Sequence, residues 1–123
     1  MEFTITSDEE FLHVQISGRE ANVPPHQLCA AVFTASEKQG RRRILLELDQ
    51  KTPLSSGAQY ALISKLPELG FTPQHRIAMV HKRAEMQKAN EFIDVVSGNR
   101  GLAVRNFPSV EDAKAWLREQ PEG

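Results

Sequence analysis

The hydrophobic residues of this chain change their spacing several times, and this alternation constrains the fold more than any other feature. Residues 12–16 alternate between apolar and polar side chains, which is typical of a strand with one buried face. In residues 28–35 the apolar side chains recur every three or four positions, as on the buried side of a helix. Residues 44–48 are almost continuously apolar, as in a strand covered on both faces. A chain that switches in this way is expected to form an α/β domain.

The same patterns along the whole chain predict a five-stranded mixed sheet, mostly parallel, with about four helices. Strands are expected near residues 2–6, 11–18, 43–49, 76–81 and 102–107, and helices near 24–39, 55–68, 84–97 and 109–119. The first strand is expected to lie antiparallel at an edge, because only a short polar turn separates it from the second. A length of 123 residues corresponds to one domain. We place this domain at residues 1–119 and expect residues 120–123 to be a frayed tail.

Individual residues sharpen the prediction for two helices. In the helix near 55–68, Tyr60, Ile63 and Leu66 recur every three residues and are expected to share one buried stripe. Ser109 can cap the final helix, because a serine side chain accepts a hydrogen bond from the first turn. Trp116 in that helix is expected to pack against the sheet.

Charge and composition exclude several classes of protein. The formal net charge of −1 lacks the basic excess that a general nucleic-acid binder needs to neutralise phosphates. Cys29 is the single cysteine, so no internal disulfide can form, and we interpret it as a structural residue of the first helix. The N-terminus has no secretion signal and no apolar run is long enough to span a membrane, which makes the cytoplasm the expected location.

The sequence contains no recognised catalytic, metal or cofactor motif. The four histidines are not spaced as the close pairs of a zinc site. The glycines fit neither the dinucleotide fingerprint nor the Walker pattern, and there is no Gly-x-Ser-x-Gly elbow. We therefore expect no metal, no cofactor and no enzymatic activity.

The candidate binding face is the edge of the sheet where the parallel strands end. In open α/β sheets, ligands bind beyond the carboxyl ends of the strands, and here those ends carry residues 49–52, 81–83 and Asn106. A helix that starts at the same edge offers free amide groups that favour an anion. The residues expected to form this face are Asp49, Thr52, Ser55, Ser56, Gly57, His81, Lys82 and Arg83. The alternative is that a serine only caps the helix and that the cations are solvated.

The element order and several local stretches resemble a known family. The stretches are Ile44–Asp49, Arg76–Val80, Gly98–Gly101, Val104–Phe107 and Glu111–Leu117. Together they resemble the STAS domain superfamily in its SpoIIAA-like branch, whose best-known members are bacterial anti-sigma-factor antagonists. The resemblance implies a non-enzymatic regulatory module that binds a partner protein, such as a regulatory or kinase-like protein. Pairing with a second copy of the chain stays open.

In the anti-sigma-factor antagonists, a partner kinase phosphorylates a serine in an Asp-Ser-Ser-Gly motif after the third strand, and the added charge breaks the interface. The corresponding segment here is Leu54-Ser55-Ser56-Gly57, so both serines and the glycine match while Leu54 replaces the acidic residue. The loop before it is also about one residue shorter. Because both serines and the glycine match, the resemblance implies a phosphoswitch at Ser55 or Ser56.

A carrier or sensor for a small apolar or amphiphilic ligand is the alternative function. The SpoIIAA-like branch resembles lipid-carrier folds in the layout of its sheet and helices. Tyr60, Met79, Met86 and Phe92 could then line a pocket, although such a stripe is also expected of ordinary core.

Overall fold

The computed structural model describes residues 2–17, 25–49, 56–72, 74–82, 94, 98 and 101–119. The elements in these ranges are β1 (Glu2–Ser7), β2 (Leu12–Ser17), α1 (Pro25–Gln39), β3 (Arg43–Asp49), α2 (Ser56–Leu69), β4 (Arg76–His81), β5 (Ala103–Phe107) and α5 (Val110–Arg118). Each of them differs from its prediction by at most one residue at either end. The predicted helix at 84–97 lies mostly outside the described residues, so three helices are described where about four were expected.

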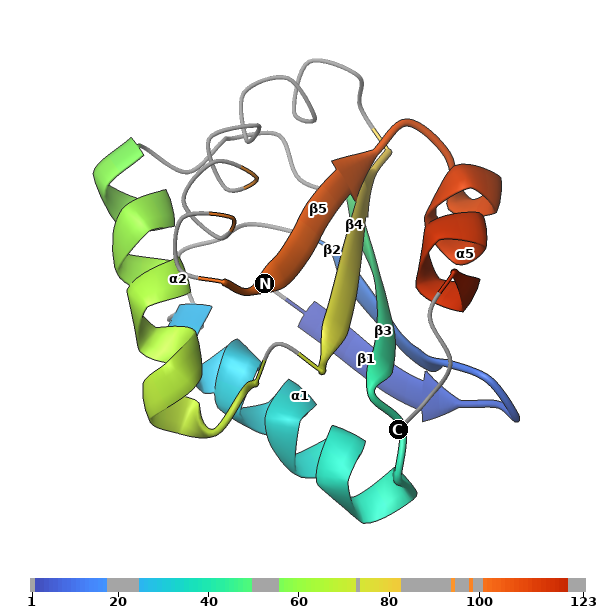
Figure 1. The fold of residues 1–123 in the computed structure, drawn as a ribbon, viewed down its shortest axis with the longest axis horizontal. Helices are drawn as coiled ribbons and strands as arrows, with labels where there is room; N and C mark the ends of the chain where they lie inside the picture. The colour runs from blue at the N-terminus through green and yellow to red at the C-terminus, as the bar shows by residue number, and fades with distance from the viewer. Residues whose placement is uncertain are drawn as a thin grey trace.

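The five strands form one mixed sheet in the order β1-β2-β3-β4-β5. β1 pairs antiparallel with β2, and every later neighbour pairs parallel, so the prediction of an antiparallel edge strand is confirmed. Figure 1 shows α1 and α2 on one face of this sheet and α5 on the other. The carboxyl ends of β2 to β5 consequently meet at one edge, as the right-handed parallel arrangement requires.

The larger core lies between the sheet and the α1–α2 layer. Leu12, Val14 and Ile16 of β2 point into it, which is the strand face that the alternating sequence predicted. The same core takes Ile44 and Leu48 from β3 together with residues of both helices. Tyr60 is an exception, since half of its surface (50%) is exposed. The prediction that Tyr60 shares the buried stripe of Ile63 and Leu66 is therefore wrong.

A smaller core lies beneath α5 on the opposite face. Leu45 of β3 and Ala78 of β4 meet Ala113, Trp116 and Leu117 of α5 there. Trp116 is 8% exposed, so the prediction that it packs against the sheet is confirmed. Because β3 and β4 place apolar residues in both cores, their sequences are almost continuously apolar.

Local hydrogen bonds define the ends of the helices. Ser109 caps α5 as predicted, because its side chain accepts a hydrogen bond of 3.1 Å from the Asp112 amide. α2 ends at Gly70, where φ is +112° and the Phe71 amide donates to the Leu66 carbonyl. This arrangement is a Schellman motif, which places a glycine just past the helix. Among the described helices, none is long and apolar enough to cross a membrane.

Candidate functional site

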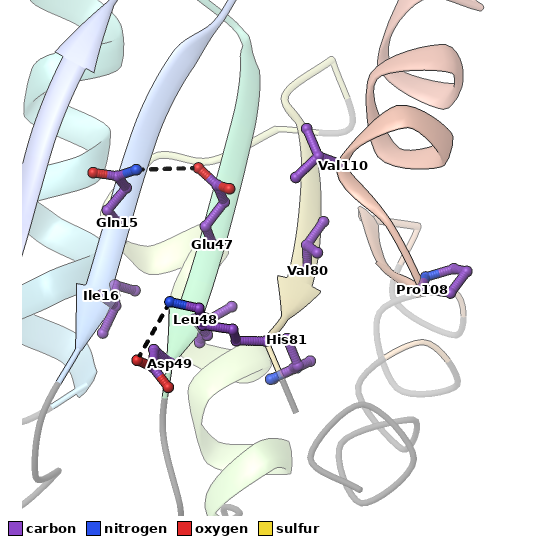
Figure 2. Close-up of a pocket in the computed structure, with 10 residues that line it drawn as sticks. Gln15, Ile16, Glu47, Leu48, Asp49, Val80, His81, Pro108 and Val110 are labelled. Atoms are coloured by element: carbon purple, nitrogen blue, oxygen red, sulfur yellow. Dashed lines mark hydrogen bonds and ion pairs between the residues drawn. The ribbon is translucent and has the colours of Figure 1, made fainter. Parts of the chain in front are cut away.

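A pocket lies at the carboxyl ends of β2, β3 and β4, beside the start of α5. Its volume is about 510 Å³, within the range of small-ligand sites. It is lined by Gln15, Ile16, Glu47, Leu48, Asp49, Val80, His81, Lys82, Pro108 and Val110. Figure 2 shows these side chains coming from the strand ends on one side and from the β5–α5 connection on the other. The pocket therefore lies at the edge of the sheet where α/β folds bind their ligands.

The polar lining of the pocket includes two carboxylates, Glu47 and Asp49. Gln15 donates a hydrogen bond of 3.4 Å from Nε2 to Oε2 of Glu47, and the two face each other in Figure 2. Lys82 Nζ lies 3.9 Å from Asp49 Oδ2. The side chains of this pair are 75% and 41% exposed, so water screens the attraction and the pair contributes little. Two carboxylates thus share the pocket with a single described ammonium group.

His81 belongs to a buried chain of hydrogen bonds at the rim of the pocket. It is 7% exposed, and its Nε2 lies 2.9 Å from Oδ1 of Asn106. Asn106 in turn donates to Asp94 Oδ1, from its backbone amide at 2.9 Å and from Nδ2 at 3.1 Å. Burial lowers the pKa of His81, and its hydrogen bond to Asn106 only partly opposes this effect. His81 is therefore neutral at pH 7.

The described pocket residues can accept hydrogen bonds and attract a cation, but they include no nucleophile next to a base. In the described part of the chain no cluster of histidine, cysteine and carboxylate residues could hold a metal ion. Cys29 lies elsewhere, and burial raises the pKa of its thiol to about 12. The thiol is therefore protonated at neutral pH, in agreement with its interpretation as a structural residue.

Comparison with known proteins identifies the fold. No protein-family model matches the sequence, and no curated protein matches it either. Among solved structures, the anti-sigma factor antagonist SpoIIAA in its unphosphorylated form matches with a TM-score of 0.55 and 14% sequence identity. The match covers 98% of this chain and 99% of that one. The chain has the SpoIIAA-like fold.

In this SpoIIAA-like fold, three of the predicted site residues come together. Asp49, His81 and Lys82 all line the pocket. Ser56 and Gly57 form the start of α2, and the side chain of Ser56 is not described. Thr52, Ser55 and Arg83 lie outside the described residues.

The sequence analysis missed three polar residues of the site, which are Gln15, Glu47 and Asp94. Gln15 lies on the solvent face of β2, and its position near a strand end was the available signal. Asp94 accepts hydrogen bonds from a residue of β5, and no local pattern indicates this contact. Of the residues expected for an apolar ligand, Tyr60 is exposed and Met79 belongs to the larger core, while Met86 and Phe92 lie outside the described residues.

The basic run at residues 41–43 connects loops at the opposite edge of the sheet. Arg41 donates from Nε to the Asp8 carbonyl at 2.8 Å, which joins the β1–β2 turn to the α1–β3 turn. Arg42 donates from Nη1 to Gln74 Oε1 at 3.0 Å, in the segment before β4. These contacts give two of the three arginines a structural role.

Proposed function

We propose that this chain is a non-enzymatic regulatory module that binds a partner protein, in the manner of an anti-sigma-factor antagonist. The observation that carries the proposal is the SpoIIAA-like fold, which extends over nearly the whole of both chains. The matched structure is that of an anti-sigma factor antagonist in its unphosphorylated form. The described pocket, with hydrogen-bonding side chains and no nucleophile–base pair, agrees with binding rather than catalysis.

The proposed binding face consists of residues 49–57 with His81, Lys82 and Arg83, and is called the serine face below. Support comes from the position of Asp49, His81 and Lys82 around one pocket at the carboxyl edge of the sheet. α2 begins at Ser56, directly after this edge. A helix start presents free amide groups and a partial positive charge, so it favours a phosphate group on a nearby serine.

Phosphorylation of Ser55 or Ser56 would act as the switch. A phosphate brings a charge of about −1.5 to −2 at neutral pH. Lys82, which is exposed and only weakly paired with Asp49, is available to contact it. The added charge would repel an acidic or apolar partner surface, so binding would be lost while the domain stays folded.

The test uses four variants of the two serines: Ser55→Asp, Ser56→Asp, and the matched alanine variants. The partner is first isolated from the native host with the wild-type chain, and its affinity for each variant is then measured by calorimetry. We expect one aspartate variant to bind at least tenfold more weakly while its alanine counterpart binds like the wild type. Circular dichroism should show that all four variants are folded.

Mass spectrometry of protein taken from the native host provides the second readout. A phosphate on Ser55 or Ser56 is the expected result. If neither serine carries phosphate and both aspartate variants bind like the wild type, the switch is refuted. If no protein partner binds the wild-type chain at all, the regulatory function is refuted.

A further inference from the structure

A row of three arginines crosses the sheet on the face that α5 covers. Arg43, the first residue of β3, pairs directly with Arg76, the first residue of β4. Arg105 of β5 lies two residues beyond Ala103, the strand partner of Arg76, and residues two apart on a strand share a face. Ala78 and Ala103 belong to the core beneath α5, so all three arginines lie on this side of the sheet (Figure 1). Like charges on neighbouring strands are unfavourable, so the row is not explained by the stability of the sheet.

Two of these guanidinium groups lie beside the same aromatic ring. Cζ of Arg76 is 4.0 Å from the ring centroid of Trp116, and Cζ of Arg105 is 5.9 Å from the same centroid. Cζ of Arg105 also lies 5.6 Å from the ring of Phe107. The indole is 8% exposed and belongs to the core beneath α5, so it is a fixed support for both cations.

Neither of the two guanidinium groups has an anionic partner in the described part of the chain. Nε and Nη1 of Arg76 are buried without a hydrogen-bond partner, which is rare in folded proteins. Nη2 of Arg76 is not one of these buried atoms and makes no hydrogen bond to a described residue, so it is open to solvent. Arg105 is exposed and forms no hydrogen bond or ion pair with a described residue. Two neighbouring side chains thus present unused N–H donors.

The described carboxylates near this row do not neutralise it. Burial lowers the pKa of Arg76, the charge of Glu119 at the end of α5 raises it, and the two neighbouring arginines lower it again. Glu119 is exposed, so water screens its attraction. Glu10 also feels the charge of Arg43, but both of its oxygens accept hydrogen bonds from Arg118. Positive charge is therefore in excess at this place.

We propose that Arg76 and Arg105 bind a phosphate group, with Arg43 adding positive charge beside them. The planar N–H donors of a guanidinium group match the oxygens of a phosphate, and the group is more weakly hydrated than an ammonium group. A phosphate has enough oxygens to accept hydrogen bonds from both arginines, and its negative charge offsets the repulsion between them. The phosphate can be free or part of a phosphorylated side chain. This site lies toward the opposite edge of the sheet from the serine face, so it goes beyond the proposed function.

The site can be tested with two small probes, inorganic phosphate and N-acetyl-phosphoserine amide, each titrated at constant ionic strength and pH 7.5. Trp116 is the single tryptophan, so its fluorescence reports on the guanidinium group stacked on it. We expect a saturable change in this fluorescence together with saturable shifts of the Nε–Hε signals of Arg76 and Arg105 in ¹H–¹⁵N spectra. The probe that binds more tightly identifies the source of the phosphate. Acetate at the same ionic strength should cause neither change.

Three variants identify the groups that bind the probes. Arg105→Gln removes the exposed guanidinium group and should weaken phosphate binding about fivefold while the domain stays folded. Arg76→Lys keeps the charge but loses the planar donors, and it should weaken binding by a similar factor. Lys65→Gln is the matched control, because it removes one exposed positive charge from α2, on the other side of the sheet. This variant should bind phosphate like the wild type.

Three results would overturn the proposal. The first is that neither probe changes the fluorescence of Trp116 or the signals of the two arginines. The second is that acetate binds as well as phosphate does. The third is an equal effect of Arg105→Gln and Lys65→Gln on binding, which would indicate a general attraction of anions. No serine variant and no partner protein enters these titrations, so a failed phosphoswitch leaves their result unchanged.

Discussion

Replacing Trp116 with alanine tests how α5 is held on the sheet. The indole is 8% exposed and packs against Phe107 at a ring distance of 5.3 Å, while the Arg76 guanidinium lies 4.0 Å above the ring. A buried tryptophan removes about 150–250 Å² from water, which at about 25 cal/mol per Å² corresponds to about 4–6 kcal/mol. The alanine side chain retains part of this burial, and the loss of the cation–π contact adds about 1 kcal/mol.

The buried guanidinium group of Arg76 reduces the loss of stability expected for this substitution. Nε and Nη1 of Arg76 are buried without a hydrogen-bond partner among the described residues, and burial lowers the pKa of this guanidinium group. Removing the indole lets water reach these atoms, which offsets part of the loss. We expect a net loss of about 3–5 kcal/mol in the free energy of unfolding, a large part of the roughly 5–15 kcal/mol available to a domain.

The assay is urea denaturation followed by far-ultraviolet circular dichroism, because Trp116 is the single tryptophan and its fluorescence disappears with it. Trp116→Phe is the control: it keeps an aromatic ring beneath Arg76 and should cost only about 1–2 kcal/mol. A loss below about 1 kcal/mol for the alanine variant would refute the packing argument. Equal losses of unfolding free energy in the two variants would refute the contribution that is assigned to the aromatic ring.

Three further predictions concern separate parts of the molecule. Gly70→Ala should destabilise the fold by about 2–4 kcal/mol, because φ is +112° and a Cβ there would lie 2.5 Å from a ring carbon of Phe33. Gly40→Ala is the control, since φ is +65° and the space around it is open, and it should cost only about 1 kcal/mol in the same urea titration. Equal losses of stability in the two variants would contradict the steric argument. The pKa of His81 is lower in the folded than in the unfolded chain, so its contribution to stability is present above the unfolded value of about 6.5 and is lost as the pH falls toward the folded value. Lowering the pH from 7.5 to 5 should therefore reduce the melting temperature of the wild type more than that of His81→Gln. Parallel plots of melting temperature against pH for the two proteins would exclude this role. Arg118 donates two hydrogen bonds to Glu10, at 2.8 and 2.9 Å, and thereby lowers the pKa of that carboxyl group. A ¹³C NMR titration of Arg118→Gln should find a higher pKa for Glu10 than in the wild type. An unchanged pKa would show that the pair does not persist in solution.

The sequence by itself determined the elements and their type. The strands at 43–49 and 76–81 were predicted with the bounds that the structure has. Their apolar runs are continuous because both faces of each strand are covered, and this requirement is visible residue by residue. The cap of α5 by Ser109 was equally predictable, because the bond spans only three residues and depends on local geometry.

Positions within an element were less predictable. Tyr60 repeats with Ile63 and Leu66 at three-residue steps, yet it is exposed. An α-helix has 3.6 residues per turn, so residues at three-residue steps gradually move around its surface. Which of them are buried therefore depends on the elements that pack against the helix. The sequence suggested that Asp49, His81 and Lys82 share an edge, but it did not indicate that they line one pocket with Gln15 and Glu47.

The tertiary structure alone decided the contacts that give those residues their chemistry. Arg118 and Glu10 pair across 108 positions, and Asp94 reaches Asn106 from a different element. Asn106 in turn lies 2.9 Å from Nε2 of His81, so the surroundings of this histidine depend on residues far from it in the sequence. Hydrogen bonds act over about 3 Å, so the partner of a side chain depends on how the elements pack, whereas hydrophobic spacing is fixed by the covalent geometry of each strand and helix.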